Sequence, residues 1–177
     1  MKTKNIKEKV KEYFFINPSA KLRVREIERE LKLPLPSVIR YCKELEKEEI
    51  LKKVKIRNVL FYTADRSAKE FLLEKKLFNI KNLYSCGLID FLIEELSNPP
   101  IIVFGSYSKG EDLENSDIDL YIETPSKRNI NVERFERVLR NKIQIFRHKN
   151  IDEIKNIHLA NNIINGVNLN GFVEVFR

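Results

Sequence analysis

The chain has 177 residues, of which 42% are hydrophobic and 33% charged, and it carries a formal net charge of +7. No apolar run approaches the ~20 residues that a membrane span requires, and two cysteines cannot build a framework of disulfides or a metal site. The charged residues 1–11 also lack the apolar segment of a signal peptide. We therefore expect a cytoplasmic protein with a hydrophobic core.

The charge is divided unevenly along the chain. Residues 1–82 contain 22 Lys and Arg against 12 Asp and Glu, whereas residues 83–177 contain 11 against 14. A basic half joined to a slightly acidic half favours two domains with different partners. The basic half is the candidate for binding nucleic acid, because neutralising phosphates requires Lys and Arg. A solvated, charge-rich surface without a ligand remains the alternative.

Three helices and a hairpin are predicted in the first third of the chain. Apolar residues recur at helical spacing in residues 6–16 and 24–31, and again from about Ser37 to Glu48. The two prolines of residues 33–36 predict a turn before the third helix. Within residues 51–62, Val54 and Ile56 alternate with Lys53, Lys55 and Arg57, and Arg57-Asn58 supplies a turn. This pattern predicts a β-hairpin.

This order of elements resembles the winged helix-turn-helix family over residues 4–63, so we expect a domain at residues 1–64. In that family the third helix enters the major groove of duplex DNA and the hairpin wing contacts the backbone or minor groove. The resemblance implies that DNA contacts come from Ser37, Arg40, Lys43, Lys53, Lys55 and Arg57. Winged helices also serve as dimer interfaces or protein-docking modules, and the acidic residues 44–49 would repel DNA locally.

The remaining two thirds of the chain are expected to form a helical connector at residues 65–98 and a second domain at residues 99–177. Gly87 is predicted to separate two helices of the connector. Beyond it the sequence predicts strands at residues 101–104, 118–122 and 143–146, helices at 131–141 and 151–164, and an extended segment that ends at Phe176. The expected fold class is α+β, with a small mixed sheet in the second domain.

One motif in the second domain indicates chemistry. An apolar strand runs into Gly105-Ser106, and Ser116-Asp117-x-Asp119 follows at the start of the next strand. Two carboxylates that are two residues apart on a strand project from the same face, where they can hold a hard divalent cation together. A glycine lets the backbone approach phosphate closely, and the Ser106 hydroxyl and the amides after it can donate to phosphate oxygens. Lys109 and Gly110 close the loop after Ser106.

Together these residues resemble the minimal nucleotidyltransferase family of the polymerase-beta-like superfamily, over residues 100–176. The resemblance implies Mg²⁺ (or Mn²⁺) at Asp117 and Asp119, and an NTP, most simply ATP, held by Gly105, Ser106, Lys109, Gly110 and Ser116. It further implies transfer of NMP to a hydroxyl of a protein or nucleic acid. Members often act as antitoxin partners of small helical toxins, so a toxin acceptor is one option. Exposed aspartates without a ligand, or a metal site unrelated to nucleotide, are the alternatives.

The sequence departs from the family at the third carboxylate. In the matching strand the central residue is Gln144, which we group with Asp117 and Asp119 as the catalytic set. An amide oxygen can ligate a cation, but it carries no charge and is a poor base. Glu123 shares the Asp119 face but lies ~13 Å further along the strand, whereas Glu174 has suitable apolar neighbours but comes after the last helix.

Three functions therefore compete. The first is a nucleotidyltransferase with a DNA-binding N-terminal domain, which could be an antitoxin-type enzyme. The second is a regulator that binds DNA, nucleotide and metal but has weakened catalysis. The third is a structural adaptor in which neither site functions.

Overall fold

The computed structural model describes residues 5–175, which form an α+β protein. The chain divides into two compact units, Met1–Phe78 and Asn79–Arg177. The boundary falls inside one helix, α4 (Lys69–Ser85), within the connector expected at residues 65–98. None of the described helices is both long and apolar enough to cross a membrane.

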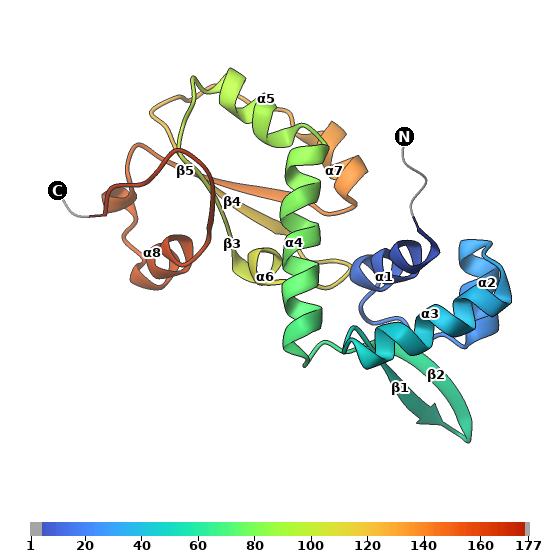
Figure 1. Cartoon of the computed structure of the whole chain (residues 1–177). Helices are drawn as coiled ribbons and strands as arrows, with labels where there is room; N and C mark the ends of the chain where they lie inside the picture. The colour runs from blue at the N-terminus through green and yellow to red at the C-terminus, as the bar shows by residue number, and fades with distance from the viewer. Residues whose placement is uncertain (1–4, 176–177) are drawn as a thin grey trace. The chain divides into compact units, whose positions relative to one another are not determined.

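The N-terminal unit contains three helices, a two-stranded antiparallel hairpin and the first part of α4 (Figure 1). Its elements are α1 (Ile6–Ile16), α2 (Val24–Leu31), α3 (Leu35–Lys47), β1 (Leu51–Ile56) and β2 (Val59–Ala64). The predicted turn at Arg57 and Asn58 is confirmed, since both residues have positive φ, as a two-residue type I′ hairpin turn requires. Leu22 adds a bridge to Tyr62 beside β2.

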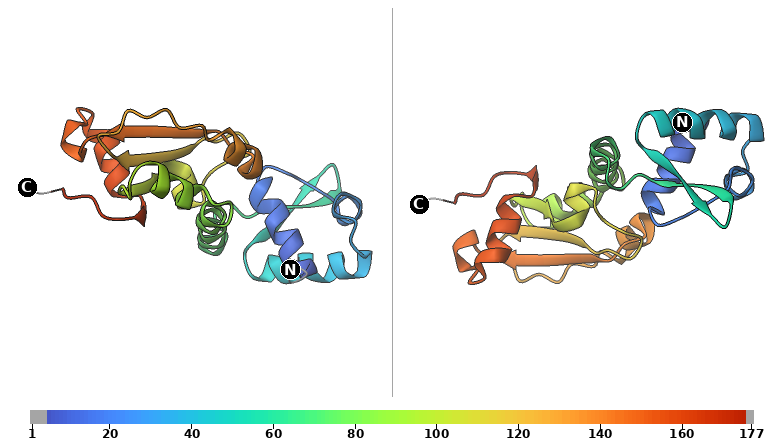
Figure 2. Two further views of the ribbon diagram at one scale, coloured as in Figure 1. Left: turned by 90° about the horizontal axis from the view of Figure 1, so that it is seen from above. Right: turned by 90° about the horizontal axis from the view of Figure 1, so that it is seen from below.

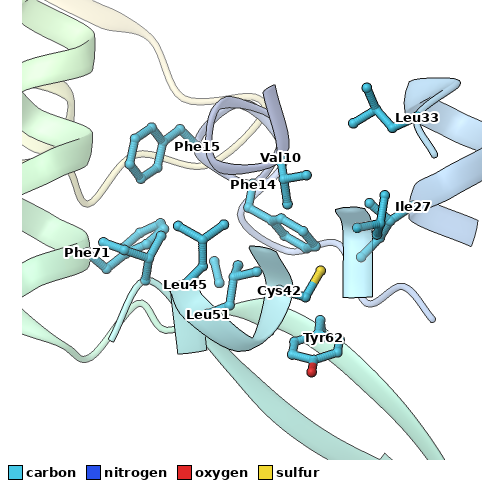
Figure 3. Close-up of a cluster of buried hydrophobic side chains, with 13 residues drawn as sticks. Val10, Phe14, Phe15, Ile27, Leu33, Cys42, Leu45, Leu51, Tyr62 and Phe71 are labelled. Carbon is cyan, nitrogen blue, oxygen red and sulfur yellow. The ribbon is translucent and has the colours of Figure 1, made fainter. Parts of the chain in front are cut away.

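A single apolar cluster holds these elements together. Val38, Cys42 and Leu45 of α3 are fully buried, as the helical spacing predicted, and they belong to one cluster with Phe14 of α1 and Ile27 of α2. Figure 3 shows Cys42 and Leu45 in this cluster. Because every helix and the base of the hairpin contribute to one core, the outward surfaces of α3 and the hairpin are held in a fixed relation.

The C-terminal unit is a four-stranded mixed sheet covered by helices. Its strands are β3 (Ile101–Phe104), β4 (Ile118–Glu123), β5 (Ile143–His148) and β6 (Val167–Asn170). The strand order is β5-β4-β3-β6, with β4 and β5 parallel and the other two pairs antiparallel. Figure 2 shows β5 along one edge of this sheet. The remaining helices are α5 (Leu88–Glu95), α6 (Gly105–Lys109), α7 (Glu133–Leu139), the 3₁₀ turn η1 (Ile151–Glu153) and α8 (Ile157–Ile164).

Helices cover both faces of the sheet. On one face, Leu88 and Leu92 of α5 and Phe135 of α7 pack against alternate residues of β3 and β4, including Val103 and Leu120. On the opposite face, η1 and α8 cover the other alternate residues, among them Ile102, Phe104 and Tyr121. This alternation decides which strand residues are left for a site.

Two predicted elements differ from those observed. Helix α3 begins at Leu35 rather than near Ser37, because Pro36 lies in its first turn, where the missing N–H is not needed. The predicted helix at residues 151–164 is interrupted: η1 ends at Glu153, and Asn156 caps a separate helix by accepting hydrogen bonds from the amides of His158 and Leu159. Beyond β6, residues 172–175 form no strand, and Phe176 lies outside the described residues.

Candidate functional site

Two aspartates lie where β4 begins, next to the end of β3. Asp119 pairs with Phe104, the last residue of β3, and Asp117 comes two residues earlier, just before the strand. Phe104 and Tyr121 belong to the face covered by η1 and α8, so Asp119, which alternates with Leu120, lies on that same face. Asp117 is exposed and Asp119 is half-buried, so the pair opens to solvent at one end of the sheet.

Position 105 requires glycine because its backbone lies close to the Asp119 side chain. A Cβ atom added at Gly105 would lie 2.5 Å from the Oδ2 atom of Asp119, and the residue has a φ of +72°. Any side chain here would therefore adopt an unfavourable backbone conformation and also push against the carboxylate. The backbone at Gly105 consequently packs directly on Asp119, and this contact explains why glycine occupies the position.

The chain after Gly105 forms the one-turn helix α6, and several hydrogen bonds shape it. Ser108 is buried and its hydroxyl donates to the carbonyl of Gly105 at 2.9 Å. Gly110 ends the turn with a φ of +76°, and its amide bonds to the carbonyls of Ser106 and Tyr107. Lys109 is exposed. Ser106 therefore lies at the start of a short helix whose backbone is fixed by hydrogen bonds.

A buried asparagine, which the sequence analysis missed, anchors this turn. The Nδ2 atom of Asn79 donates to the carbonyl of Tyr107 at 2.9 Å and to Oδ1 of Asp112 at 2.7 Å. Asn79 is 2% exposed and lies on the inner side of α4, four residues before the fully buried Leu83. A polar residue at helical spacing on an otherwise buried face was the available signal.

The loop that carries Asp117 is fixed from both sides. The Ser116 hydroxyl accepts a hydrogen bond from the amide of Leu113, and the Ser116 carbonyl accepts one from Nδ2 of Asn141 at 2.8 Å. The amide of Ile118 donates to the carbonyl of Lys142. The segment before β5 thus holds the start of β4 in place. Ser116 shapes the backbone beside Asp117.

Gln144 lies directly beside Asp119. The two residues are paired in the parallel register of β4 and β5, and Gln144 is exposed. Ile143 and Ile145 pack with the α5 face, whereas Phe146 packs with the α8 face, so alternation places Gln144 on the face of Asp119. Gln144 of β5 therefore lies beside Asp119, on the same face of the sheet.

The other candidate carboxylates and the histidines are used elsewhere or lie apart from the pair. Oε2 of Glu123 accepts hydrogen bonds from the Tyr121 hydroxyl and the Ile151 amide, so Glu123 supports η1 at the opposite end of β4. Glu174 is exposed and follows β6 outside any strand. His148 stacks on Tyr121 with ring centroids 6.1 Å apart, and His158 is exposed on α8.

The electrostatics of the pair suit a cation. Burial raises the pKa of Asp119, and the negative charge of Asp117 raises it further. A divalent cation would relieve this repulsion, and two carboxylates are the hard oxygen donors that Mg²⁺ prefers. Among residues 5–175, however, no three His, Cys, Asp or Glu side chains form a metal-binding group. The donor set fits one divalent ion with two charged ligands.

The basic residues expected to bind DNA lie in the N-terminal unit, and they differ in what they contact. Lys53 forms an ion pair with Glu46 of α3 at 2.6 Å, so its charge is offset. Arg40 lies over the ring of Tyr41 and 3.7 Å from Glu44. Within residues 5–175, no ion pair involves the exposed Lys43, Lys55 or Arg57. Ser37 is half-buried in the first turn of α3.

Comparison with known proteins finds one family-model match, and it covers the region that contains the two aspartates. No curated protein and no solved structure gave a match to the chain. Residues 85–164 match the family model described as the nucleotidyltransferase domain. The matched segment includes α6, β4 and β5, and with them Gly105, Ser106, Asp117, Asp119 and Gln144. The C-terminal unit thus contains a region that matches the nucleotidyltransferase domain family.

Proposed function

We propose that the C-terminal unit is a metal-dependent nucleotidyltransferase that transfers NMP, most simply AMP from ATP, to a hydroxyl of a protein or nucleic acid. The hydroxyl oxygen bonds to the α-phosphorus, and the α–β phosphoanhydride bond breaks to release pyrophosphate. The observation that carries this proposal is the contact between Gly105 and Asp119 beside Asp117, with Gln144 in register on the next strand. The family match over residues 85–164 supports the general reaction. A toxin protein as acceptor, which would make this an antitoxin-type enzyme, is one form of the proposal.

Each site residue has a distinct part in this proposal. Asp117 and Asp119 would hold Mg²⁺ or Mn²⁺, which when bound neutralises triphosphate charge and activates the attacking oxygen. Gly105 lets the backbone approach the phosphates, and the Ser106 hydroxyl donates to a phosphate oxygen. Lys109 supplies a positive charge from the exposed end of α6. Gly110 and Ser116 keep the two loops closed through their hydrogen bonds.

Gln144 limits how fast the transfer can be. Its amide can donate to or accept from an acceptor hydroxyl and so orient it beside Asp119. It cannot take the hydroxyl proton as a carboxylate would, because an amide is too weak a base at neutral pH. Slow transfer is therefore expected, with the acceptor or solvent taking the proton.

The same residue favours a second function. If the two aspartates bind metal and nucleotide without efficient transfer, the protein would act as a nucleotide-responsive regulator. The exposed amide at Gln144, where the family has its third carboxylate, is the observation that favours it. The two functions differ in whether label moves from the NTP to another molecule.

We also propose that the N-terminal unit is a winged helix that binds duplex DNA. The order of three helices and a hairpin around one core supports this, as does the basic charge of the first half of the chain. The outward residues of α3, Ser37, Arg40 and Lys43, would reach the major groove. Lys53, Lys55 and Arg57 would contact the backbone as a wing.

One assay tests the transfer directly. The full chain is incubated with NTPs labelled on the α-phosphate, saturating Mg²⁺ and cell extract, and acceptors are detected by retained label. We expect slow, ATP-preferring labelling that is lost when EDTA is added. The double variant Asp117→Asn with Asp119→Asn should abolish both labelling and the metal-dependent nucleotide binding measured by calorimetry.

A matched control separates the site from general loss of charge. The variant Asp90→Asn with Asp152→Asn removes the same number of carboxylates from the same unit, but both are exposed and lie outside the site. It should behave like the wild type. Nucleotide binding without transfer would favour the regulator, and undiminished binding in the Asp117 and Asp119 double variant would exclude the site assignment.

A further inference from the structure

A second basic site lies in the N-terminal unit, on the surface of the hairpin that faces away from α3. It is a pocket of about 490 Å³ formed where three segments meet: the α1–α2 connection, the hairpin, and the chain that leads into α4. Lys21, Lys52 and Arg66 come one from each segment. Among the described residues that line the pocket, none is acidic, so its charge is positive.

The alternation of the hairpin separates this pocket from the proposed DNA surface. Lys53 points to α3, where it pairs with Glu46, so the neighbouring Lys52 projects from the opposite face of β1. Lys52 is paired across the hairpin with Thr63, and both residues line the pocket. Lys53 and Lys55 share the other face. The pocket and the proposed wing contacts therefore use different faces of the same two strands.

Hydrogen-bond donors accompany the positive charges. Thr63 of β2 is 6% exposed, carries a hydroxyl group and lines the pocket. Ser67 lies at the rim, where its hydroxyl donates to Oδ1 of Asp65 at 2.9 Å. The same oxygen accepts from Nζ of Lys52 at 3.0 Å. Asp65 thus offsets Lys52, while no ion pair within residues 5–175 offsets Lys21 or Arg66.

We propose that this pocket binds a small phosphate-bearing anion. Two unpaired cations and a shared third match the charge of a phosphate monoester, and the Thr63 hydroxyl supplies a further hydrogen-bond donor to phosphate oxygens. The volume is within the range of ligand pockets, roughly 300–1,000 Å³. A concave site of this size suits a free phosphorylated molecule, whereas a nucleic-acid backbone extends over a longer surface.

The test uses the ¹⁵N-labelled full chain and inorganic phosphate as the probe, followed by AMP. Spectra are recorded at constant ionic strength with chloride as the balancing anion. We expect saturable shifts of the amides of Thr63, Arg66 and Ser67. Binding at the C-terminal site would be distinguished because it would move Gly105 and Ser106 instead.

Two variants with equal charge loss give the decisive comparison. Lys21→Ala with Arg66→Ala removes the two unpaired cations of the pocket, and each lost charge-assisted contact should weaken phosphate binding about tenfold. Lys9→Ala with Arg25→Ala removes one exposed lysine and one exposed arginine from outside the pocket and should leave the affinity unchanged. All four side chains are exposed, so both variants are expected to fold.

Three results would overturn the proposal. The first is that these amides do not shift with phosphate or AMP. The second is that phosphate and chloride shift them equally, which would indicate general counter-ion attraction. The third is that they respond only to a short DNA duplex, which would assign the pocket to a nucleic-acid surface and not to a small anion.

Discussion

The two units present their candidate functional side chains in different ways. In the C-terminal unit, strand register places Asp119 next to Gln144, and a glycine lets the backbone at Gly105 contact Asp119. A substitution at Gly105 would therefore disturb the arrangement. In the N-terminal unit, the basic side chains lie on an exposed surface, and some are already paired with glutamates. A site for chemistry depends on exact backbone placement, whereas a surface for phosphates depends mainly on the sum of its charges.

The largest expected effect is a change in the transfer rate when Gln144 is replaced by a carboxylate. Gln144→Glu should raise single-turnover transfer by roughly a hundredfold at saturating Mg²⁺, because a positioned base contributes about that factor or more. The added negative charge should also strengthen metal binding. Gln144→Asp should act in the same direction with a shorter reach.

The measurement is transfer of labelled NMP by wild type and both variants to the same acceptor. Gln144→Leu is the control, since it removes the amide without supplying a base and should lower the rate. Fast wild-type transfer that the glutamate leaves unchanged would contradict the account of Gln144. Ile143 and Ile145 pack on the other face of β5, so Gln144 and neither isoleucine shares the face of Asp119.

Gly105→Ala tests whether the close backbone approach is needed. The positive φ alone should cost about 1–2 kcal/mol of stability, and the new methyl group would displace the Asp119 carboxylate. Gly87→Ala is a closely matched control, because Gly87 has a φ of +79° and no atom within 4 Å of the added Cβ. Urea denaturation should show a loss in both variants, while only Gly105→Ala should weaken metal-dependent nucleotide binding.

Equal nucleotide affinity in the two glycine variants would contradict this prediction. It would mean that Asp119 can move without consequence for the site.

In the N-terminal unit, removing exposed charges of the proposed wing should have a smaller effect that does not depend on the DNA sequence. Lys55→Ala with Arg57→Ala should weaken binding of the full chain to every duplex alike and reduce the salt slope by about 2, since each phosphate contact contributes roughly 0.9. Lys53→Ala should change affinity less, because Glu46 already offsets that charge. Fluorescence anisotropy at several salt concentrations measures both quantities.

Lys21→Ala with Arg66→Ala serves as the control for this experiment, because it removes the same charge from the other face of the hairpin. A loss equal to that of the wing variant would show that only net charge matters. Absence of DNA binding at low salt would favour a docking or dimerisation role for this unit.

The smallest expected effect is on stability and its dependence on pH. Because the folded state raises the pKa of Asp119, it holds that proton more tightly than the unfolded chain does. The contribution of this carboxyl to stability therefore falls as pH rises from its unfolded pKa through its folded pKa. Asp119→Asn should be more stable than wild type at pH 7, and the difference should vanish below the unfolded pKa.

Because Asp119 is only half-buried, solvent screening should keep this gain below about 1 kcal/mol. Thermal unfolding from pH 3 to pH 8 measures it, with Asp152→Asn as an exposed control. A gain that does not change with pH would point to packing rather than to charge.

The elements that follow from simple periodicity could be predicted from the sequence. The three N-terminal helices, the turn at Arg57 and Asn58, and the strands that flank the Gly105 motif are all observed. The break in the predicted helix at residues 151–164 was missed, because Asn156 competes locally by capping backbone amides. The spacing of apolar residues carries little information about a side chain that caps backbone amides.

Of the candidate site, the sequence predicts the residues but not their support. The spacing of Asp117 and Asp119 indicated a shared face, and the resemblance to the family assigned Gln144 to the position of the third carboxylate. The contact of Gly105 with Asp119, the Asn141 bond to Ser116 and the buried Asn79 depend on segments far apart in the sequence. Such contacts require the tertiary fold.

The position of Gln144 on an exposed edge strand also bears on how this chain can evolve. A glutamine codon becomes a glutamate codon through one nucleotide substitution, and the side chain at this position already lies in register with Asp119. Because Gln144 is exposed, the exchange requires no repacking of the core. A single nucleotide substitution thus separates this protein from one with three carboxylates in the site. Selection could either add the third carboxylate or retain the glutamine.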